Sequence, residues 1–377
     1  MKNLFFPVAF AMVLSASAAR AEVIELDVFF EEPKVWSDEA GYSHLEQASC
    51  LLLGRPGEPQ LPVRSITLAL PPDHRSVSVE VTAPEWIKLP GYHVLFPVQP
   101  PRPLSLPGPF PFREPQPEIY LSAASFPPQP VKNAVRQFLH GFSLLQLELL
   151  PVVYHPAEGR LEWAPVLHVK VVTGPQSALE ASGRMVWRGR EQDLNEVRRL
   201  VANPELLALY SRPRSNVLSP DYRYLIITTQ ALAACSGSNT LNTLLQSKQA
   251  RGIPARMETL ESIRSAYSGT DDAAKIREFI KDMYQNHGAQ FALLVGDADG
   301  QVVGGETQAP VIPVRYLWGD IGSGVDQLPS DLYYGALDGN FDANGVVSTF
   351  LCQEQQMGGN SLVFVFEAED GVHDALQ

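Results

Sequence analysis

The segment DGNFDANG places an oxygen-bearing side chain at every second position. These side chains belong to Asp338, Asn340, Asp342 and Asn344, and Gly345 follows them. Alternate side chains can converge on one hard cation while a glycine allows a sharp turn, so the spacing favours a structural calcium site. A second interpretation stays open, because Asp and Asn side chains also bond their own backbone in turns that bind no metal.

A shorter acidic segment, VGDADG, follows an apolar run. Asp297 and Asp299 come directly after Gly296. Ligands of open parallel sheets bind beyond the carboxyl ends of the strands, where these carboxylates would hold a cation or shape the wall of an active site. Alternatively, Asp297 caps the following turn through its own side chain.

Three short apolar runs predict the strands that carry these loops. They lie at 224–227, 255–260 and 291–295. Such runs are typical of parallel strands, which are covered on both faces. Amphipathic stretches between them predict helices, so the expected order is strand, helix, strand, helix, strand. This order implies right-handed crossovers and a parallel sheet with helices on its faces.

The ends of the two helices carry their own signals. The first helix has leucines at helical spacing from Leu241 and is expected to stop at Gly252, because a residue without Cβ suits a helix end. Ser268 and Asp271 have the spacing of a capping box at the start of the second helix. The second helix is expected to end near Gly288.

The region before the α/β segment has a different composition. Prolines are frequent in residues 22–190, and apolar and polar positions alternate, as in VSVEVTA at 77–83. This pattern predicts β-strands joined by proline-rich connections. Two strand-like runs on either side of a turn at 157–160 predict a β-hairpin. We expect a β-sandwich without catalytic residues.

An amphipathic stretch, EQDLNEVRRLVANPELLALYSRPRSN, follows the β-region and is expected to be a helical linker. Exposed linkers are where processing proteases cut, and Pro213 blocks cleavage after Arg212. Arg214 is therefore the predicted processing residue. The alternative is an ordinary solvated basic pair.

The first residues predict export. They combine an early lysine, a short apolar run and small residues up to Ala21, after which a signal peptidase is expected to cut. The apolar run is too short to span a bilayer, so we expect a secreted protein without a membrane span. The formal net charge of −13 argues against a nucleic-acid partner, which needs a basic surface.

Several segments, in this order, resemble the start of the catalytic domain of the gingipain family of secreted cysteine peptidases. They read YRYLIITT, SKQARG, IPARMETL, FALLVGDADG and PSDLYYGALDGNFDANG. Upstream, GRPGEPQLPVRSITLALPP resembles the family's amino-terminal pro-domain. The resemblance covers roughly 54–72 and 222–345. Asp331 also matches a family position, with a structural or calcium-linked role.

The resemblance implies an activity and its regulation. Members of the family hydrolyse peptide bonds of protein or peptide substrates through a cysteine thiolate. They bind calcium, and a pro-domain packed on the catalytic domain keeps them latent. The calcium loop of this chain would then be of the gingipain type.

The catalytic cysteine and histidine of the family are not found. His287 is followed by glycine but ends a helix, where a histidine favours the helix dipole. Cys50 is in the pro-region and Cys235 comes too early in the domain. The residues after Cys352, QEQQMGGN, do not continue as the family's cysteine motif does. No catalytic residue is assigned, and we expect the chain as given to be truncated or frame-disturbed, and inactive.

The expected fold is α+β multidomain, with a β-sandwich pro-domain followed by a parallel, caspase-like α/β domain that is incomplete. The boundaries are a signal peptide at 1–21, a β-rich pro-domain at 22–190, a helical linker with the processing site at 191–214, the first half of the catalytic domain at 215–345, and a divergent tail at 346–377. A sheet cut short exposes an unpaired apolar edge, so we expect marginal stability after residue 215.

The expected function is that of a secreted precursor of a gingipain-like cysteine endopeptidase. The alternative is a non-catalytic secreted module that binds calcium and a partner.

Overall fold

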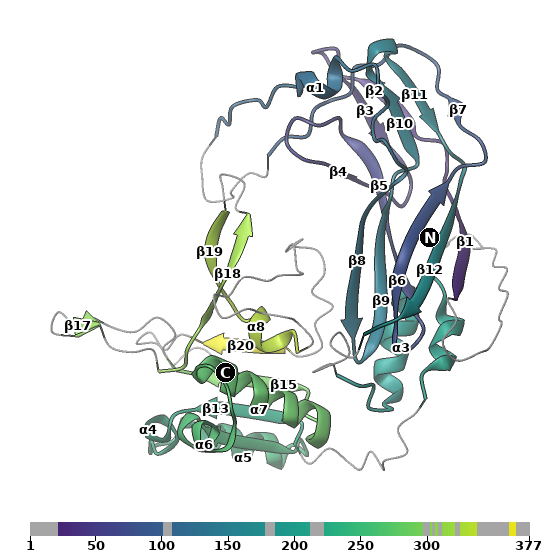
Figure 1. The fold of residues 1–377 in the computed structure, drawn as a ribbon. Helices are drawn as coiled ribbons and strands as arrows, with labels where there is room; N and C mark the ends of the chain where they lie inside the picture. The colour runs from purple at the N-terminus through teal and green to yellow at the C-terminus, as the bar shows by residue number, and fades with distance from the viewer. Residues whose placement is uncertain are drawn as a thin grey trace. The chain divides into compact units, whose positions relative to one another are not determined.

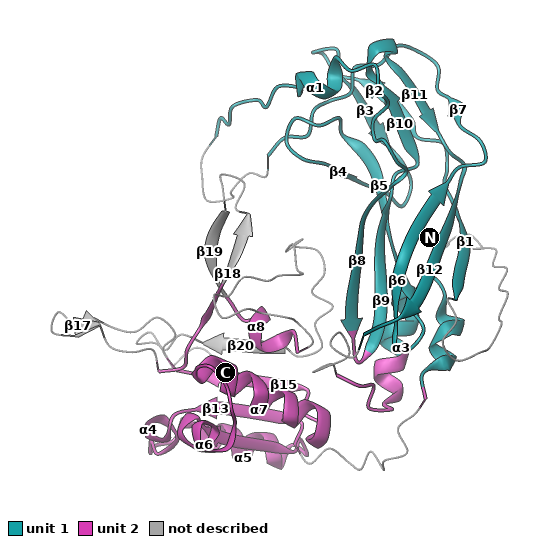
Figure 2. Ribbon diagram, viewed as in Figure 1, with its two compact units in different colours: residues 1–138, 142–181, 195–210 teal, residues 139–141, 182–194, 211–377 magenta. Residues whose placement is uncertain are grey.

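The computed structural model describes residues 22–100, 108–177, 185–211, 222–296, 302–303, 306–307, 311–320, 325–337 and 362–366. The chain divides into two compact units (Figure 2). Unit 1 comprises residues 1–138, 142–181 and 195–210, and unit 2 comprises 139–141, 182–194 and 211–377. The expected cleavage residues, Ala21 and Arg214, lie outside the described residues.

Unit 1 is built from β-sheets with antiparallel strand pairs, as its alternating sequence predicts (Figure 1). One sheet has the order β4-β5-β9-β8, formed by Leu51–Leu53, Leu61–Ala69, Phe142–Leu149 and Val131–Leu139. A second has the order β1-β12-β6, formed by Val23–Phe29, Val166–Pro175 and His74–Thr82. The smaller sheets are β10-β11-β7 (Val152–His155, Arg160–Trp163 and Ile87–Lys88) and β2-β3 (Lys34–Ser37 and Ser43–Glu46).

The burial of these strands follows their sequence patterns. Strand β1 alternates between exposed and buried positions, because one of its faces meets water. Every residue of β9 is buried, so both faces of this strand are covered. The short helix α1 (Pro117–Tyr120) and the 3-10 turns η1 (Pro156–Glu158) and η2 (Pro204–Leu209) connect the strands.

The predicted β-hairpin is confirmed. Strands β10 and β11 pair antiparallel, and η1 with Gly159 forms the turn between them. Gly159 has a φ of 56°, and a Cβ at this position would lie 2.4 Å from the Tyr92 ring. Both the backbone angle and the close approach of the ring require glycine.

The segment expected to be a helical linker is packed into the protein. Helix α3 (Glu191–Leu200) buries Leu194, Val197 and the following Val201. After the helix, the Asn203 side chain accepts a hydrogen bond from the Ala69 N–H at 2.7 Å and donates one to the Ala69 carbonyl at 2.9 Å. The division between the units falls inside α3, after Leu194.

Unit 2 contains a parallel sheet of order β14-β13-β15-β20 (Figure 1). Its strands are Ala255–Thr259, Tyr224–Thr228, Phe291–Val295 and Leu362–Phe366. Its helices are α4 (Gln230–Ala233), α5 (Leu241–Ala250), α6 (Leu260–Ala266), α7 (Asp272–His287) and α8 (Leu332–Gly335). Two-stranded pieces are β16-β17 (Val302–Val303 and Glu306–Thr307) and β18-β19 (Arg315–Asp320 and Val325–Ser330).

The sequence predicts three of these parallel strands and misses the fourth. Strand β20 pairs with β15 along its whole length, so the edge of β15 that we expected to be unpaired is covered. The run LVFVF at 362–366 is continuously apolar, which is typical of a buried parallel strand. This apolar run lies in the expected divergent tail, outside the segments that resemble the gingipain family.

The helix ends are largely as expected. Asp271 caps α7 by accepting a hydrogen bond from the Ala274 N–H at 2.9 Å, and Gly288 ends the helix with a φ of 79°. Ser268 is not the N-cap, so the predicted capping box is wrong, and α7 starts three residues later than that box implies. Helix α6 was not predicted, because Thr259 ends the strand and caps this helix at once.

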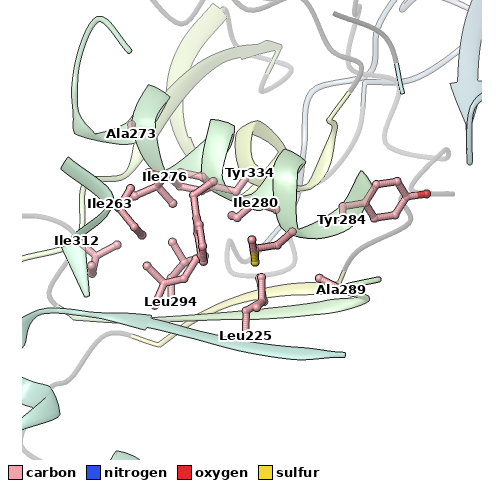
Figure 3. Close-up of a cluster of buried hydrophobic side chains, with 14 of the residues drawn as sticks. Leu225, Ile263, Ala273, Ile276, Ile280, Tyr284, Ala289, Leu294, Ile312 and Tyr334 are labelled. Atoms are coloured by element: carbon pink, nitrogen blue, oxygen red, sulfur yellow. The ribbon is translucent and has the colours of Figure 1, made fainter. Parts of the chain in front are cut away.

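The core of unit 2 lies between the sheet and helices α6, α7 and α8. Leu225 and Leu294 point from the strands into this layer, where Ile263, Ile276 and Ile280 meet them (Figure 3). Helix α5, which has no buried residue, contributes nothing to this cluster. The long helix α7 is therefore the main partner of the sheet.

Candidate functional site

The carboxyl ends of β13 and β15 form the edge where open parallel sheets bind ligands. Thr228 is buried at this edge, and its hydroxyl donates a hydrogen bond to the Val295 carbonyl at 3.0 Å. The Glu261 carboxylate accepts a hydrogen bond from the Gln230 N–H at 2.9 Å. These bonds fix the start of the loops that follow the strands.

The segment after β15 is closely covered. A Cβ on Gly296 would lie 2.7 Å from the Cγ1 atom of Ile312 and 2.8 Å from that of Val311. Asp297 and Asp299, which follow, lie outside the described residues, so both of their interpretations stay open.

The chain that leads into the predicted calcium loop is held by a buried arginine of α7. Arg277 donates hydrogen bonds to the carbonyls of Tyr333, Ala336 and Leu337, at 2.8, 2.6 and 3.1 Å. These carbonyls lie at the end of α8, where helical backbone lacks internal donors. Arg277 thus fixes the backbone up to the residue before Asp338.

The predicted calcium ligands themselves are not among the described residues. Asp338, Asn340, Asp342 and Asn344 all lie outside them. Asp331, at the start of α8, accepts hydrogen bonds through its carbonyl from the N–H groups of Tyr334 and Gly335.

A second arginine ties the same region to the N-terminus of α7. Arg315 donates to both carboxylate oxygens of Asp271, at 3.0 and 2.9 Å, and lies 4.4 Å from the centre of the Tyr333 ring. Burial of Asp271 raises its pKa, but the hydrogen bonds from Arg315 and from the backbone outweigh this, so that the pKa of Asp271 is lowered. The carboxylate is therefore held in its charged form.

The described thiols do not form a catalytic pair. Burial raises the pKa of Cys50 to about 11, against the opposing charge of Arg64, so this thiol is protonated at neutral pH. The Cys50 thiol lies 3.8 Å from the Gln47 side chain, and the exposed Cys235 thiol lies 3.6 Å from the Ala231 carbonyl. No histidine in the described part of the chain bonds either thiol. Cys352 lies outside the described residues.

The histidine that superficially matches the family motif closes a helix. His287 is the last residue of α7, as the sequence indicates, and its carbonyl accepts a hydrogen bond from the Tyr222 N–H. Within the described ranges, no group of three or more His, Cys, Asp or Glu side chains could hold a metal. No helix in this part of the chain is both long enough and apolar enough to cross a membrane.

The buried arginines are the residues that sequence reasoning missed. Arg277 follows an apolar residue of the α7 stripe, and Arg188 lies in MVWRGR at the end of the β-rich region. A charged residue at such positions normally faces water, and only the fold shows that backbone carbonyls surround it.

Comparisons with known proteins agree with the order of the two units along the chain. The model of peptidase family C25 matches residues 217–358, and the model of the C25 propeptide matches residues 28–187. No curated protein matches the chain. The peptidase match extends beyond residue 345, where the resemblance visible in the sequence stops.

Two solved structures are similar to the chain. A complex of Porphyromonas gingivalis RgpB pro- and mature domains has 14% identity over 52% of this chain and 97% of that chain, with a TM-score of 0.39. A structure concerning the zymogenic latency of gingipain K from Porphyromonas gingivalis has 17% identity over 44% of this chain and 97% of that chain, with a TM-score of 0.33.

The matched ranges include most strands of unit 1 and the parallel strands β13, β14 and β15 of unit 2. A propeptide match followed by a peptidase match is the order of a peptidase precursor. The chain belongs to peptidase family C25, the gingipain family, and carries the family's propeptide followed by part of its catalytic domain.

Proposed function

We propose that this protein is a secreted precursor of a cysteine endopeptidase that cleaves protein or peptide substrates. The observation that carries the proposal is the succession of a C25 propeptide and a C25 peptidase segment in one chain. The parallel sheet of unit 2 supports it, since this is the scaffold on which loops at strand ends position catalytic groups.

The finer fold assignment is part of this proposal. Unit 2 is caspase-like, with a first strand flanked on both sides and helices that connect neighbouring parallel strands. Unit 1 is a β-sandwich, and the complete burial of β9 supports two covering layers. In the zymogen, this pro-domain packs on the catalytic domain and keeps it latent.

The reaction of the family needs a thiolate that attacks the peptide carbonyl and a histidine that transfers the proton to the leaving amine. Neither role fits the thiols described above, because Cys50 is buried with a raised pKa and no histidine among the described residues bonds Cys235. We propose that the 377-residue polypeptide has no peptidase activity of its own.

A thiol-reactive active-site probe tests this directly. Purified protein is labelled before and after single replacement of Cys235 and Cys352 by alanine, and peptide cleavage is measured in parallel. We expect no labelling that correlates with cleavage. Labelling at one cysteine, with cleavage lost when that cysteine is replaced, would contradict the proposed inactivity and support the peptidase assignment.

Export is the second part of the proposal. The N-terminal residues have the composition of a secretory signal, and cleavage after Ala21 would leave Glu22 as the first residue. Expression with the signal, followed by N-terminal sequencing of the exported protein, checks the site. Retention of the intact N-terminus in the membrane fraction would favour the alternative, in which the uncleaved apolar run serves as a membrane anchor.

We also propose that the segment at 338–344 binds Ca²⁺ as a structural ion. The donor set fits, since two carboxylates and two amide oxygens are the hard ligands that Ca²⁺ prefers. Asp338, Asn340, Asp342 and Asn344 would hold the ion, and Arg277 would fix the entry of the loop. Saturating Ca²⁺ is expected to raise the melting temperature, whereas Mg²⁺ is not. An Asp342→Asn variant that keeps the full Ca²⁺ response would exclude the site.

A further inference from the structure

Strands β2 and β3 form a hairpin near one end of unit 1 (Figure 1). In their antiparallel register Trp36 lies opposite His44, and Lys34 lies opposite Glu46. Leu45, between His44 and Glu46, is buried in a core cluster. Because side chains alternate across a strand, the two pairs share the opposite face of the hairpin, which is turned to solvent.

Trp36 keeps one face of its indole open. The ring stacks on His44, with centres 5.7 Å apart and planes 16° from parallel. The imidazole also stacks on Phe96, at 4.8 Å and 29°. This stack covers one face of the indole, and 48% of Trp36 stays exposed. No second ring is stacked on the indole in the described part of the chain, so its outer face is available to a ligand.

A carboxylate fixes the stack from one side. Asp38 accepts a hydrogen bond from Nε2 of His44 at 3.0 Å and another from the Tyr42 N–H at 2.9 Å. The bond from His44 is the main reason that the pKa of Asp38 is lowered, so this carboxylate is charged at neutral pH. A ligand that stacks on Trp36 therefore meets a surface that is already ordered, which favours binding.

The neighbouring rings do not form a cage for a cation. Tyr42 lies 5.7 Å from Phe96 and 5.9 Å from Phe112, and Phe96 and Phe112 are 5.8 Å apart, measured between ring centres. Aromatic rings at such separations are in direct contact, so no ligand fits between them. The Lys34 ammonium on the outer face further disfavours a cationic ligand. The open face of Trp36 is thus a flat stacking surface.

Charged side chains border this flat surface. Nζ of Lys34 lies 3.9 Å from the Glu46 carboxylate, and both side chains are largely exposed. This pair lies two residues along the strands from Trp36, a step of about 7 Å. A protein partner needs about 800 Å² of surface on each side, far more than one ring bordered by charges supplies. The surface instead matches a ligand about the size of one sugar ring.

We propose that the outer face of the β2-β3 hairpin binds a glucose- or galactose-type pyranose of a glycan. Such a sugar has C–H bonds on a ring face and hydroxyl groups around its edge. The C–H face stacks on the indole of Trp36. The Lys34 ammonium donates to a hydroxyl oxygen, and the Glu46 carboxylate accepts from a neighbouring hydroxyl. Binding at this site is separate from peptide hydrolysis.

Saturation-transfer NMR of the full chain tests the proposal, with cellohexaose as the glucose-type probe and β-1,4-galactotetraose as the galactose-type probe. We expect at least one of them to bind, with saturation strongest at the C–H protons of one ring face. The dissociation constant should be about 0.1–1 mM, which is the range expected for one stacked ring and a few hydrogen bonds. Tetramethylammonium is the probe for a cation site and is expected not to bind.

Three variants locate the binding. Trp36→Ala removes the stacking surface and should weaken sugar binding at least about tenfold, the equivalent of 1.4 kcal/mol. Tyr316→Ala, the matched control, removes an exposed aromatic side chain of unit 2 and should bind like the unaltered protein. Glu46→Ala should weaken binding about fivefold, the effect of one hydrogen bond, and tests the same face if Trp36→Ala does not fold.

The proposal is overturned if neither sugar binds the unaltered protein, or if tetramethylammonium binds in their place. It is also overturned if folded Trp36→Ala binds the sugar unchanged, or if Tyr316→Ala loses as much affinity as Trp36→Ala. Should Trp36→Ala fail to fold, unchanged binding in Glu46→Ala overturns it. The readout needs no peptidase activity, so its outcome is independent of the thiol-probe experiment.

Discussion

The two ends of α7 are each held by an arginine from another part of unit 2, but in opposite environments. At the N-terminal end Arg315, which is 15% exposed, pairs with Asp271, whose side chain is 45% exposed. At the C-terminal end Arg188 and Asp193 are 6% and 5% exposed. Water screens the first pair, whereas the second depends wholly on its protein partners. The two ion pairs are therefore expected to contribute unequally to the free energy of unfolding.

The largest effect is expected at the buried end. Arg188→Met removes the cation that lies 3.5 Å from the buried Asp193 carboxylate and the donor to the carbonyls of Tyr284 and Ala289, which should reduce the free energy of unfolding by about 3–5 kcal/mol. Urea denaturation of the full chain, followed by fluorescence, measures the loss. Adding Asp193→Asn to Arg188→Met removes the uncompensated charge and should recover part of the stability. No recovery in the double variant would contradict the charge-pair explanation.

An intermediate effect is expected midway along the helix. Arg277→Met removes the donor of three carbonyl bonds to the residues that precede Asp338. We expect a loss of about 2–3 kcal/mol in unfolding free energy, because buried acceptors are left unpaired. The same variant should also reduce the gain in melting temperature from Ca²⁺. An undiminished Ca²⁺ response would show that Ca²⁺ binding at 338–344 does not depend on the hydrogen bonds of Arg277.

A small effect is expected at the exposed end. Arg315→Ala removes a pair whose carboxylate is open to water, so the loss should be at most about 1 kcal/mol, since Asp271 keeps its capping bond to Ala274. The same denaturation experiment measures it, with added salt as a control that reduces the difference. A loss as large as that of Arg188→Met would refute the comparison between the two ends.

The smallest effect concerns pH. The pKa of Asp271 is lowered in the folded protein, so its charged form contributes stability above the ordinary value of 3.8, and this contribution is lost as the pH falls through the lower, folded value. The stability advantage over Asp271→Asn should therefore be constant near neutral pH and shrink on acidification below about pH 4. A stability advantage that increases on acidification would contradict the lowered pKa of Asp271.

The sequence predicts the strand and helix order of the α/β segment because its periodicity is strong. Strand β15 was predicted with its observed bounds, and the end of α7 at Gly288 follows from the glycine. Strand β20 was missed, although its apolar run is plain, because no motif of the family accompanies it. The resemblance to the family therefore missed a strand that its apolar run alone indicates.

The arginine contacts could not be predicted from the sequence, since they join residues far apart in the chain. Arg188 and Tyr284 are separated by 96 positions, and nothing in MVWRGR indicates that its arginine bonds to the end of α7. The candidate calcium ligands are the reverse case, because the sequence names them and they lie between the described residues 325–337 and 362–366. Spacing within a short segment indicates candidate metal ligands, whereas contacts between distant residues are seen only in the tertiary fold.

Amide hydrogen exchange of the full chain tests most directly whether the α/β unit is built from two separated parts of the chain. Peptides covering 185–194 and the last turn of α7 should exchange slowly together, and both should exchange faster in Arg188→Met. Rapid exchange of 185–194 in the unaltered protein, with α7 still protected, would contradict the account.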